Sequence, residues 1–294
     1  MKKLQGTFTA LVTPFKENGE IDVPALENLV EWQIESGING LVPCGSTGEA
    51  ATLDIDDYKL VVETVVKQAA GRVLVIAGAT SNDTKVAVEL SKIAKDAGVN
   101  GLLHATPYYN KPTLPGLIAH YKAIADSTDL PILIYNVPGR TALNLTAVMT
   151  LEIVKKVDQV VGIKEASGNI NQIMEVIKDA PSYFSTLSGD DSMTLPLMAA
   201  GGLGIISVIS NEIPKEMADL AKSGIEGDFI KARIIHYEWL DLMKVNFIES
   251  NPIPVKTALE LMGKIEANFR LPLVPMEEGN KQFLKKILKE HSLI

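Results

Sequence analysis

Val160-Val161-Gly162-Ile163-Lys164 is a short run of mostly β-branched residues, followed closely by the turn-forming pair Ser167-Gly168. Short apolar runs bounded by turn residues are typical of strands buried on both faces of a parallel sheet. The chain contains seven other runs of this kind. The eight runs, each bounded by Gly, Pro, Asn or Ser, are 7–12, 40–42, 73–77, 101–104, 132–135, 160–164, 183–187 and 203–207. We therefore expect eight buried parallel strands.

Amphipathic patterns fill the segments between these runs. Residues 24–35 and 84–95, for example, repeat apolar side chains three and four positions apart, as one face of a helix requires. The residues suited to helix N-caps are Asp22, Asp54, Asn82 and Thr146, and the glycines suited to helix ends are Gly37 and Gly98. Eight strands, each followed by a helix, predict an α/β protein with a closed (β/α)8 barrel, the TIM barrel.

The last part of the chain has a different pattern. The eighth helix is expected to begin near Pro214 and to complete a catalytic barrel over residues 1–224. Residues 225–294 show no strand-like alternation and predict about three helices, interrupted at 251–254 and at 271–275 by proline-rich segments. We interpret this part as a C-terminal helical domain packed on the barrel or on a neighbouring subunit.

Charge and cysteine content narrow the classes of function. The formal net charge is −8 and the isoelectric point is near 5.2, which argues against nucleic acid as a partner. The single cysteine, Cys44, rules out an internal disulfide. No apolar run approaches the roughly 20 residues that span a bilayer, and polar residues from Gln5 onward interrupt any signal-like segment. These observations predict a cytoplasmic protein without a membrane partner.

Lys164 is the most informative polar residue, because active sites of such barrels lie at the C-terminal ends of the strands. Alternation places it on one face of the strand with Val160 and Gly162, and places Glu165 on the other face. Burial would lower the pKa of the ammonium and make the amine a usable nucleophile. A lysine that extends past the strand end to water, or pairs with Glu165, remains the alternative on position alone.

Other strand ends carry hydroxyl groups that favour the catalytic interpretation. Tyr135 ends the neighbouring strand and could exchange protons with a carbinolamine formed on Lys164. Ser46, Thr47 and Tyr109 follow the second and fourth strands and supply further hydroxyls. A lone tyrosine at a strand end usually has only a structural role, but three hydroxyl-bearing strand ends beside a lysine favour chemistry.

Arg140, just after the fifth strand, offers a planar fork for a carboxylate, although a surface ion pair is the common role of a loop arginine.

Motifs for phosphate, dinucleotide and metal binding are missing or out of place. The 45–49 segment, Gly-Ser-Thr-Gly-Glu, lacks the Gly-Lys-Ser/Thr of a phosphate-binding loop. The Gly-Leu-Gly at 202–204 is not a dinucleotide-binding motif, because it precedes a strand and does not open a helix after one. The four histidines have no metal-type spacing. Asp190-Asp191 could bind a divalent cation, although capping of the next helix is the simpler interpretation. We expect no metal and no organic cofactor.

Four motifs together resemble one family. They are Gly-Ser-Thr-Gly-Glu at 45–49, Pro-Tyr-Tyr-Asn-Lys-Pro at 107–112, Tyr-Asn-Val-Pro-Gly-Arg-Thr at 135–141 and Gly-Ile-Lys-Glu-Ala-Ser-Gly at 162–168. They are similar to motifs of the dihydrodipicolinate synthase / N-acetylneuraminate lyase family of class I aldolases, and the similarity extends to 205–207, 249–256 and 270–275. Arg140 and the Asn-Pro-Ile-Pro at 251–254 resemble the synthase branch.

The resemblance implies a mechanism without a cofactor. Pyruvate would form an imine and then an enamine on Lys164, and the enamine would attack L-aspartate 4-semialdehyde to give 4-hydroxy-tetrahydrodipicolinate, on the route to lysine and diaminopimelate. The roles implied are proton transfer for Tyr135, Ser46 and Tyr109, with Tyr109 coming from a neighbouring subunit, and substrate binding for Thr47, Arg140, Ile206 and Gly189. The resemblance also implies a homotetramer built from two tight dimers.

Two features depart from the synthase branch. The relay position Ser46 is more often threonine there, and serine is the residue of the lyase branch. A possible allosteric pocket for lysine would comprise Asn82, Tyr108, Ala51 and Val86. Where lysine-sensitive relatives have polar or acidic residues, this chain has Ile55, Tyr58 and Val86, and an apolar residue cannot pair with an α-amino group. We therefore expect weak or absent inhibition by lysine.

Two other functions remain open on the sequence. A pyruvate-dependent lyase of a sugar acid, of the N-acetylneuraminate or 2-keto-3-deoxygluconate type, is favoured by Ser46 and disfavoured by Arg140. A family member that has lost catalysis and acts as a sensor or scaffold is disfavoured by the intact set of Lys164, Tyr135 and Thr47.

Overall fold

The computed structural model describes residues 3–294 and contains a closed barrel of eight parallel strands in the order of the chain. The strands are β1 Gly6–Ala10, β2 Gly40–Val42, β3 Leu74–Gly78, β4 Gly101–Ala105, β5 Ile132–Asn136, β6 Val160–Glu165, β7 Ser185–Ser188 and β8 Gly204–Ser207. β8 pairs with β1, which closes the sheet. The predicted (β/α)8 barrel is therefore confirmed.

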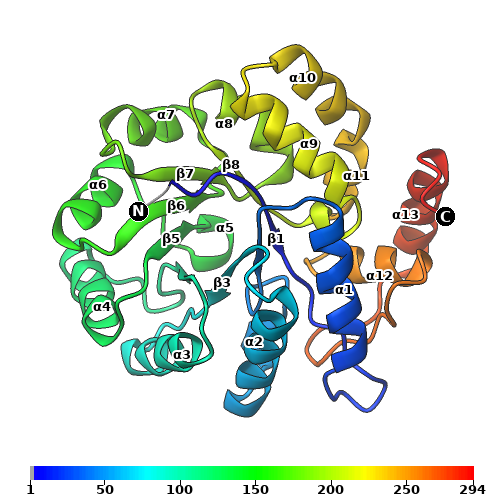
Figure 1. Ribbon diagram of the computed structural model, residues 1–294, viewed down its shortest axis with the longest axis horizontal. Coiled ribbons are helices and arrows are strands. Elements are labelled where there is room, and N and C mark those ends of the chain that lie inside the picture. The colour runs from blue at the N-terminus through cyan, green and yellow to red at the C-terminus, as the bar shows by residue number, and fades with distance from the viewer. Residues whose placement is uncertain (1–2) are drawn as a thin grey trace.

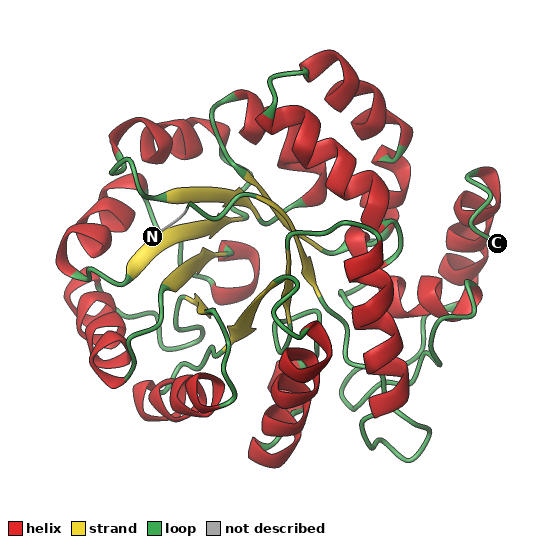
Figure 2. Ribbon diagram, viewed as in Figure 1, coloured by secondary structure: helices red, strands yellow, loops and turns green. Residues whose placement is uncertain are grey.

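Helices surround the strands on all sides, as Figures 1 and 2 show. They are α1 Val23–Glu35, α2 Ile55–Ala69, α3 Thr84–Asp96, α4 Leu114–Ser127, α5 Pro138–Thr141, α6 Ala147–Lys156, α7 Ile170–Asp179, α8 Thr194–Ala199, α9 Pro214–Ile225, α10 Phe229–Glu238, α11 Leu240–Val245, α12 Ile253–Leu261 and α13 Glu278–Glu290. Three short 3-10 helices, η1 Ala50–Thr52, η2 Asp191–Met193 and η3 Ile209–Asn211, follow β2, β7 and β8.

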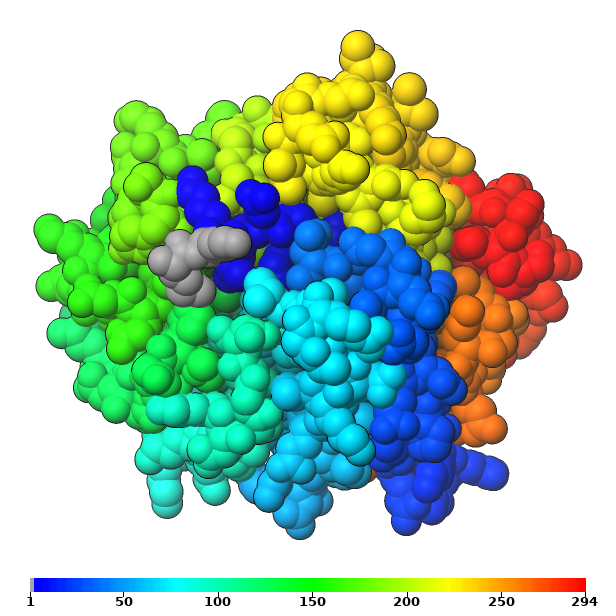
Figure 3. Space-filling view, viewed as in Figure 1, coloured from blue at the N-terminus to red at the C-terminus, as the bar shows by residue number. Residues whose placement is uncertain are grey.

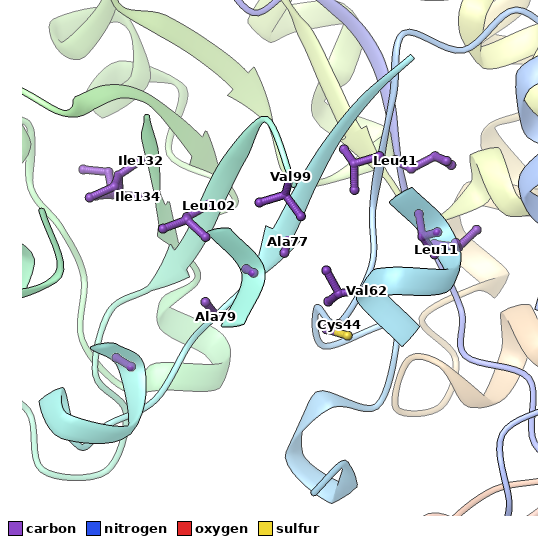
Figure 4. Close-up of a cluster of buried hydrophobic side chains, with 14 of the residues drawn as sticks. Leu11, Leu41, Cys44, Val62, Ala77, Ala79, Val99, Leu102, Ile132 and Ile134 are labelled. Atoms are coloured by element: carbon purple, nitrogen blue, oxygen red, sulfur yellow. The ribbon is translucent and has the colours of Figure 1, made fainter. Parts of the chain in front are cut away.

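The outward faces of the strands form the larger part of the core. Figure 4 shows this layer, in which Leu41, Ala77 and Leu102 point from the strands toward the helices, with Val62 of α2 packed beside them. A smaller cluster, which includes Phe8, Ile76, Leu133 and Leu187, fills the inside of the barrel. Each strand is thus buried on both faces, which explains its continuous apolar sequence.

Two predicted strand boundaries were wrong. β1 ends at Ala10 and not at residue 12, because the amide of Val12 donates to the side chain of Asn211 at 3.2 Å instead of to a strand. β7 begins at Ser185 and not at residue 183, because the amide of Phe184 closes a turn onto the carbonyl of Pro181 at 2.9 Å.

Most of the predicted helix caps are confirmed. The side chains of Asp22, Asp54 and Thr146 accept amide hydrogen bonds at the starts of α1, α2 and α6. Asn82 was wrong as a cap: Asp83 caps α3 by accepting from the amide of Lys85 at 2.9 Å.

The C-terminal part contains four helices, α10 to α13, where about three were predicted. The additional break lies at Trp239, between α10 and α11, where no proline or glycine marks it in the sequence. Buried residues of these helices share one cluster with Ile205 of β8 and Met217 of α9. They therefore pack directly on the last β/α unit, and the division of the chain at residue 224 remains a prediction.

Candidate active site

A cavity of about 910 Å³ lies where the loops after the strands meet the C-terminal segment. Its lining includes residues at the ends of all eight strands and in the segment before α12, among them Ser46, Thr47, Ala105, Tyr135, Arg140, Lys164, Gly189 and Asn251. The cavity thus lies at the C-terminal ends of the strands, where the active site is expected for this fold.

Lys164 is buried near the end of β6, with 5% of its surface exposed, and it lines the cavity. It pairs in register with Tyr135 of β5, and its Nζ lies 4.5 Å from the centre of the Tyr135 ring. Burial lowers the pKa of Lys164 to about 8; the nearby Asp191 carboxylate opposes this shift, and Arg140 adds to it. A much larger share of this lysine is therefore the neutral amine near neutral pH than of a solvated lysine.

Glu165 is not the ion-pair partner of Lys164. It lies on the opposite face of β6, where its carboxylate accepts hydrogen bonds from Asn136 at 3.1 and 3.2 Å and from the amide of Ser167 at 2.7 Å. The alternative of a lysine that extends to solvent or pairs with Glu165 is therefore not what the structure shows.

Tyr135 provides a phenol beside the amine. Its hydroxyl stays protonated at neutral pH, because burial raises its pKa to about 12. A protonated phenol next to a neutral amine can donate a proton to a carbinolamine oxygen and take it back later.

Gly189 lies against the lysine. A Cβ at this position would come within 2.9 Å of Cγ and 3.0 Å of Cε of Lys164, and within 3.0 Å of Cβ of Ala166. The absence of a side chain at Gly189 therefore leaves the space that the stem of Lys164 occupies.

Ser46 and Thr47 belong to the loop of residues 45–49 after β2. Both line the cavity, Ser46 as an exposed residue and Thr47 as a buried one. The side chain of Asn251 donates to Oγ1 of Thr47 at 2.9 Å, and the backbone carbonyl of Asn251 accepts a hydrogen bond from Nη2 of Arg140 at 3.1 Å. Asn251 therefore connects two of the predicted substrate-binding residues.

Arg140 sits on the short helix α5 and reaches the rim of the cavity. Within residues 3–294 it forms no ion pair, so its guanidinium is available for a carboxylate. The common role of a loop arginine, a surface ion pair, is not seen here.

Three predicted residues lie elsewhere. Tyr109 is 89% exposed and does not line the cavity of its own chain. Ile206 is fully buried in β8 with its side chain in the barrel interior. Asn82 also lies outside the lining, and its amide donates to the carbonyl of Tyr108 at 3.2 Å.

The other members of the predicted lysine pocket line the same cavity. Ala51, Val86 and Tyr108 lie there with the apolar side chains of Ile55 and Leu90. Among these five residues there is no carboxylate that could pair with an amino group.

Sequence reasoning missed the roles of Asn251 and Asp191. Asn251 was noted in a proline-rich break and in a motif of the family, but nothing in the local pattern indicated contact with the 45–49 loop. Asp191 is buried, and its carboxylate accepts from Oγ of Ser207 at 2.5 Å and from two backbone amides after β8. Asp190, not Asp191, caps η2. No cluster of His, Cys, Asp and Glu arranged for a metal ion occurs in residues 3–294.

No helix in the described part of the chain is long and apolar enough to cross a membrane.

Comparison with known proteins gives a consistent result. The sequence matches the dihydrodipicolinate synthetase family over residues 3–291. The 4-hydroxy-tetrahydrodipicolinate synthase of Maridesulfovibrio salexigens is 53% identical over 290 residues, with 99% of each chain covered. The crystal structure of dihydrodipicolinate synthase from Aquifex aeolicus is similar with a TM-score of 0.96 and 46% identity, again over 99% of each chain.

A second similar structure holds a ligand. The chloride-inhibited dihydrodipicolinate synthase from Acinetobacter baumannii, determined in complex with pyruvate, gives a TM-score of 0.97 at 41% identity and covers 99% of this chain and 100% of that one.

Proposed function

Because the chain belongs to the dihydrodipicolinate synthetase family, we propose that it condenses pyruvate with L-aspartate 4-semialdehyde to give 4-hydroxy-tetrahydrodipicolinate. It is a lyase of lysine and diaminopimelate biosynthesis. The proposed chemistry rests on one observation: Lys164 is a buried amine of lowered pKa that lies at the end of a barrel strand, beside the phenol of Tyr135. The cytoplasm remains a prediction of the sequence.

The first half of the reaction activates pyruvate. The neutral Nζ of Lys164 attacks the keto carbon, and Tyr135 donates the proton with which the carbinolamine oxygen leaves as water. Loss of a methyl proton from the resulting imine gives the enamine. Thr47 and the backbone of Ile206 are the proposed holders of the pyruvate carboxylate, and Gly189 leaves room for the lysine and its adduct.

The second half forms the ring. The enamine carbon attacks the aldehyde carbon of the semialdehyde, and a C–C bond forms as the aldehyde oxygen takes up a proton. The α-amino group of the same molecule then attacks the imine carbon, displaces Lys164 and closes the ring. Arg140, free of an ion pair in the described chain, is the proposed partner of the semialdehyde carboxylate.

The proton relay requires a second subunit. Ser46 and Tyr135 line the cavity, but Tyr109 is not part of its lining and is 89% exposed. We propose that Tyr109 completes the site of a neighbouring subunit in a tight dimer. A separate exposed apolar stripe on α10, formed by Ile230, Ile234 and Tyr237, offers a second face for pairing dimers into a homotetramer.

Reductive trapping tests the proposed activity. Pyruvate and borohydride should attach a reduced pyruvate adduct to Lys164, identified by peptide mass spectrometry, and a Lys164→Met variant should give none. Aspartate semialdehyde should then be turned over, whereas sialic acid and ketogluconate-type substrates should not. Absence of trapping would overturn the Schiff-base mechanism, and trapping without turnover of the semialdehyde would support the sugar-acid lyase.

Inhibition by lysine should be weak or absent. Ala51, Ile55, Val86 and Tyr108 offer no carboxylate for the α-amino group of lysine, and the carboxylate of Asp54, which also lines the cavity, accepts from the amide of Asp57 as the N-cap of α2. Initial rates at increasing lysine concentration check this expectation. The Val86→Glu variant, which introduces an acidic residue where lysine-sensitive relatives have one, is measured for comparison. Half-maximal inhibition of the unmodified enzyme by sub-millimolar lysine would refute it.

A further inference from the structure

Glu49 and Lys256 form an ion pair inside the protein, at a distance of 2.6 Å between Oε1 and Nζ. Both side chains are almost completely buried, with exposed fractions of 1% and 0%. Glu49 ends the 45–49 loop after β2, whereas Lys256 lies in α12 of the C-terminal part. The pair therefore joins an active-site loop to a helix about 200 residues later in the chain.

Stability alone does not explain such a pair. Removing two charges from water is costly, and apolar side chains of similar volume often stabilise a core equally well or better. Here the surroundings are apolar: Nζ of Lys256 lies 4.4 Å from the ring centre of Phe15 and 4.9 Å from that of Phe269. Burial accordingly lowers the pKa of Lys256, and Glu49 opposes this shift. A buried ion pair does, however, fix one relative position of the two segments through directional hydrogen bonds.

Glu49 is rigidly connected to the catalytic part of its loop. Its backbone has a left-handed conformation with φ of 55°, and its amide donates to the carbonyl of Ser46 at 3.2 Å. The amide of Gly48 donates to the carbonyl of Gly45 at 3.0 Å, and the carbonyl of Gly48 accepts from Oγ1 of Thr13 at 2.8 Å. A displacement of Glu49 is therefore transmitted through this compact turn to Ser46 and Thr47.

The C-terminal segment holds the loop at two positions, Thr47 and Glu49. Asn251, just before α12, donates to Thr47, and Lys256 binds Glu49 and also donates to the carbonyl of Asn268 at 2.5 Å. The amide of Arg270 donates to the second carboxylate oxygen of Glu49 at 3.3 Å.

Arg270 ties this attachment to the surrounding loops. Its guanidinium binds the carboxylate of Asp57 and the carbonyls of Gly19 and Thr52. In Figures 1 and 3 the orange C-terminal residues lie directly beside the blue residues that include α1, consistent with the contact to Gly19.

We infer that Glu49 and Lys256 are a positioning pair, through which the C-terminal helical segment holds Ser46 and Thr47 in the geometry that pyruvate binding and imine formation require. This inference rests on the proposed function, because it assigns the loop to pyruvate. It assigns no chemical step to the pair, since both carboxylate oxygens of Glu49 accept hydrogen bonds from Lys256 and Arg270, and Nζ of Lys256 is bound to Glu49 and Asn268. The C-terminal helices therefore help to position the active-site loop.

The double variant E49Q/K256M tests the inference. It removes both charges and leaves no unpaired buried ion, so it should fold and assemble. Because the loop loses a charge-assisted anchor, the KM for pyruvate should rise about tenfold and borohydride trapping at limiting pyruvate should slow by a similar factor. The KM for the semialdehyde should change far less, because Arg140 retains its own contacts. A purely structural role would instead lower the melting temperature and leave the KM for pyruvate unchanged.

Two further variants keep the result decisive. Glu49→Asp retains both charges but shortens the side chain by one methylene, so it should give the same selective rise in the KM for pyruvate even where the double variant is unstable. Lys281→Met is the matched control, because it breaks a more exposed pair with Glu260 at 2.9 Å in the same C-terminal part, and its kinetics should be unchanged. Folded Glu49→Asp with the KM for pyruvate of the unmodified enzyme would overturn the inference. Failure of the unmodified enzyme to trap pyruvate would instead overturn the proposed function.

Discussion

Lys164 and Gly189 lie against each other at the ends of β6 and β7. Because Gly189 has no side chain, the stem of Lys164 can occupy the space beside it, and this sets the position of the amine. The stem of Lys164 passes within 2.9 to 3.0 Å of the point where a Cβ on residue 189 would lie. Real side chains almost never approach so closely, so any larger residue must displace the lysine or the loop.

We expect Gly189→Ala to fold but to lose activity. Displacement of Nζ by several tenths of an ångström should lower kcat on the order of 10²-fold, because attack on the keto carbon depends steeply on alignment. Gly279→Ala is the matched control, since a Cβ there meets nothing within 4 Å. Steady-state kinetics and thermal melting of both variants check the expectation, and a Gly189→Ala enzyme with normal kcat would contradict it.

The contrast between Lys164 and Lys256 shows how far single residues could be predicted. Lys164 was identified because a charge at the end of an apolar strand stands out against its neighbours. Lys256 is more deeply buried, yet it lies in a helical pattern where lysines are common and normally solvated. Its partner Glu49 is about 200 residues away, and only the closed barrel brings the two together.

β4, α3 and α4 enclose two histidines that are neutral in the folded protein. Burial lowers the pKa of His104 to about 3 and that of His120 to about 4, and Nδ1 of His104 and Nε2 of His120 have no hydrogen-bond partner within the described chain. The unfolded chain binds protons on these groups below about pH 6.5, where the folded chain does not. Their contribution to stability is therefore present above pH 6.5 and is lost as the pH falls toward 4.

Replacement of His104 by leucine should make the protein less sensitive to acid. Between pH 6.5 and pH 4.5 the free energy of unfolding should decrease in both proteins. The decrease should be about 2 kcal/mol smaller in the variant than in the unmodified protein, because the variant lacks one titrating group. Ser91, which contacts Nε2 of His104, keeps its own hydrogen bond to the carbonyl of Ala87. Urea unfolding followed by tryptophan fluorescence at several pH values measures this difference. Parallel pH profiles for the two proteins would show that His104 does not contribute.

At the level of elements, strands were easier to predict than helix breaks. A strand buried on both faces has an apolar sequence and a defined length, so all eight were found within two residues of their observed ends. The break at Trp239 has no such local signal. Trp239 stacks on His291 after α13, with ring centres 4.6 Å apart, and this contact joins residues that only the folded chain brings together.

At the scale of the whole molecule, the proposed relay needs a residue that lies outside the cavity of its own chain. Ser46 and Tyr135 line the cavity, but Tyr109 is 89% exposed, with a left-handed φ of 71°. If this tyrosine takes part in the proposed relay, the site that it serves must belong to another copy. The role of Tyr109 remains a prediction, because periodicity within one chain carries no information about a second chain.

Mixing of two inactive variants distinguishes a shared site from a self-contained one. Lys164→Ala removes the amine, and Tyr109→Phe removes the relay hydroxyl. In a mixed dimer with Tyr109 acting across the interface, the subunit that keeps Lys164 receives an intact Tyr109 from its partner, so one of the two sites is complete. Random pairing of equal amounts should then restore about a quarter of the activity of the unmodified enzyme, since half of the dimers are mixed and each has one good site. If Tyr109 serves its own subunit instead, no chain in the mixture has both residues, and the activity will not exceed the average of the two variants. Co-refolding of differently tagged subunits, with isolation of the doubly tagged species, makes that comparison directly.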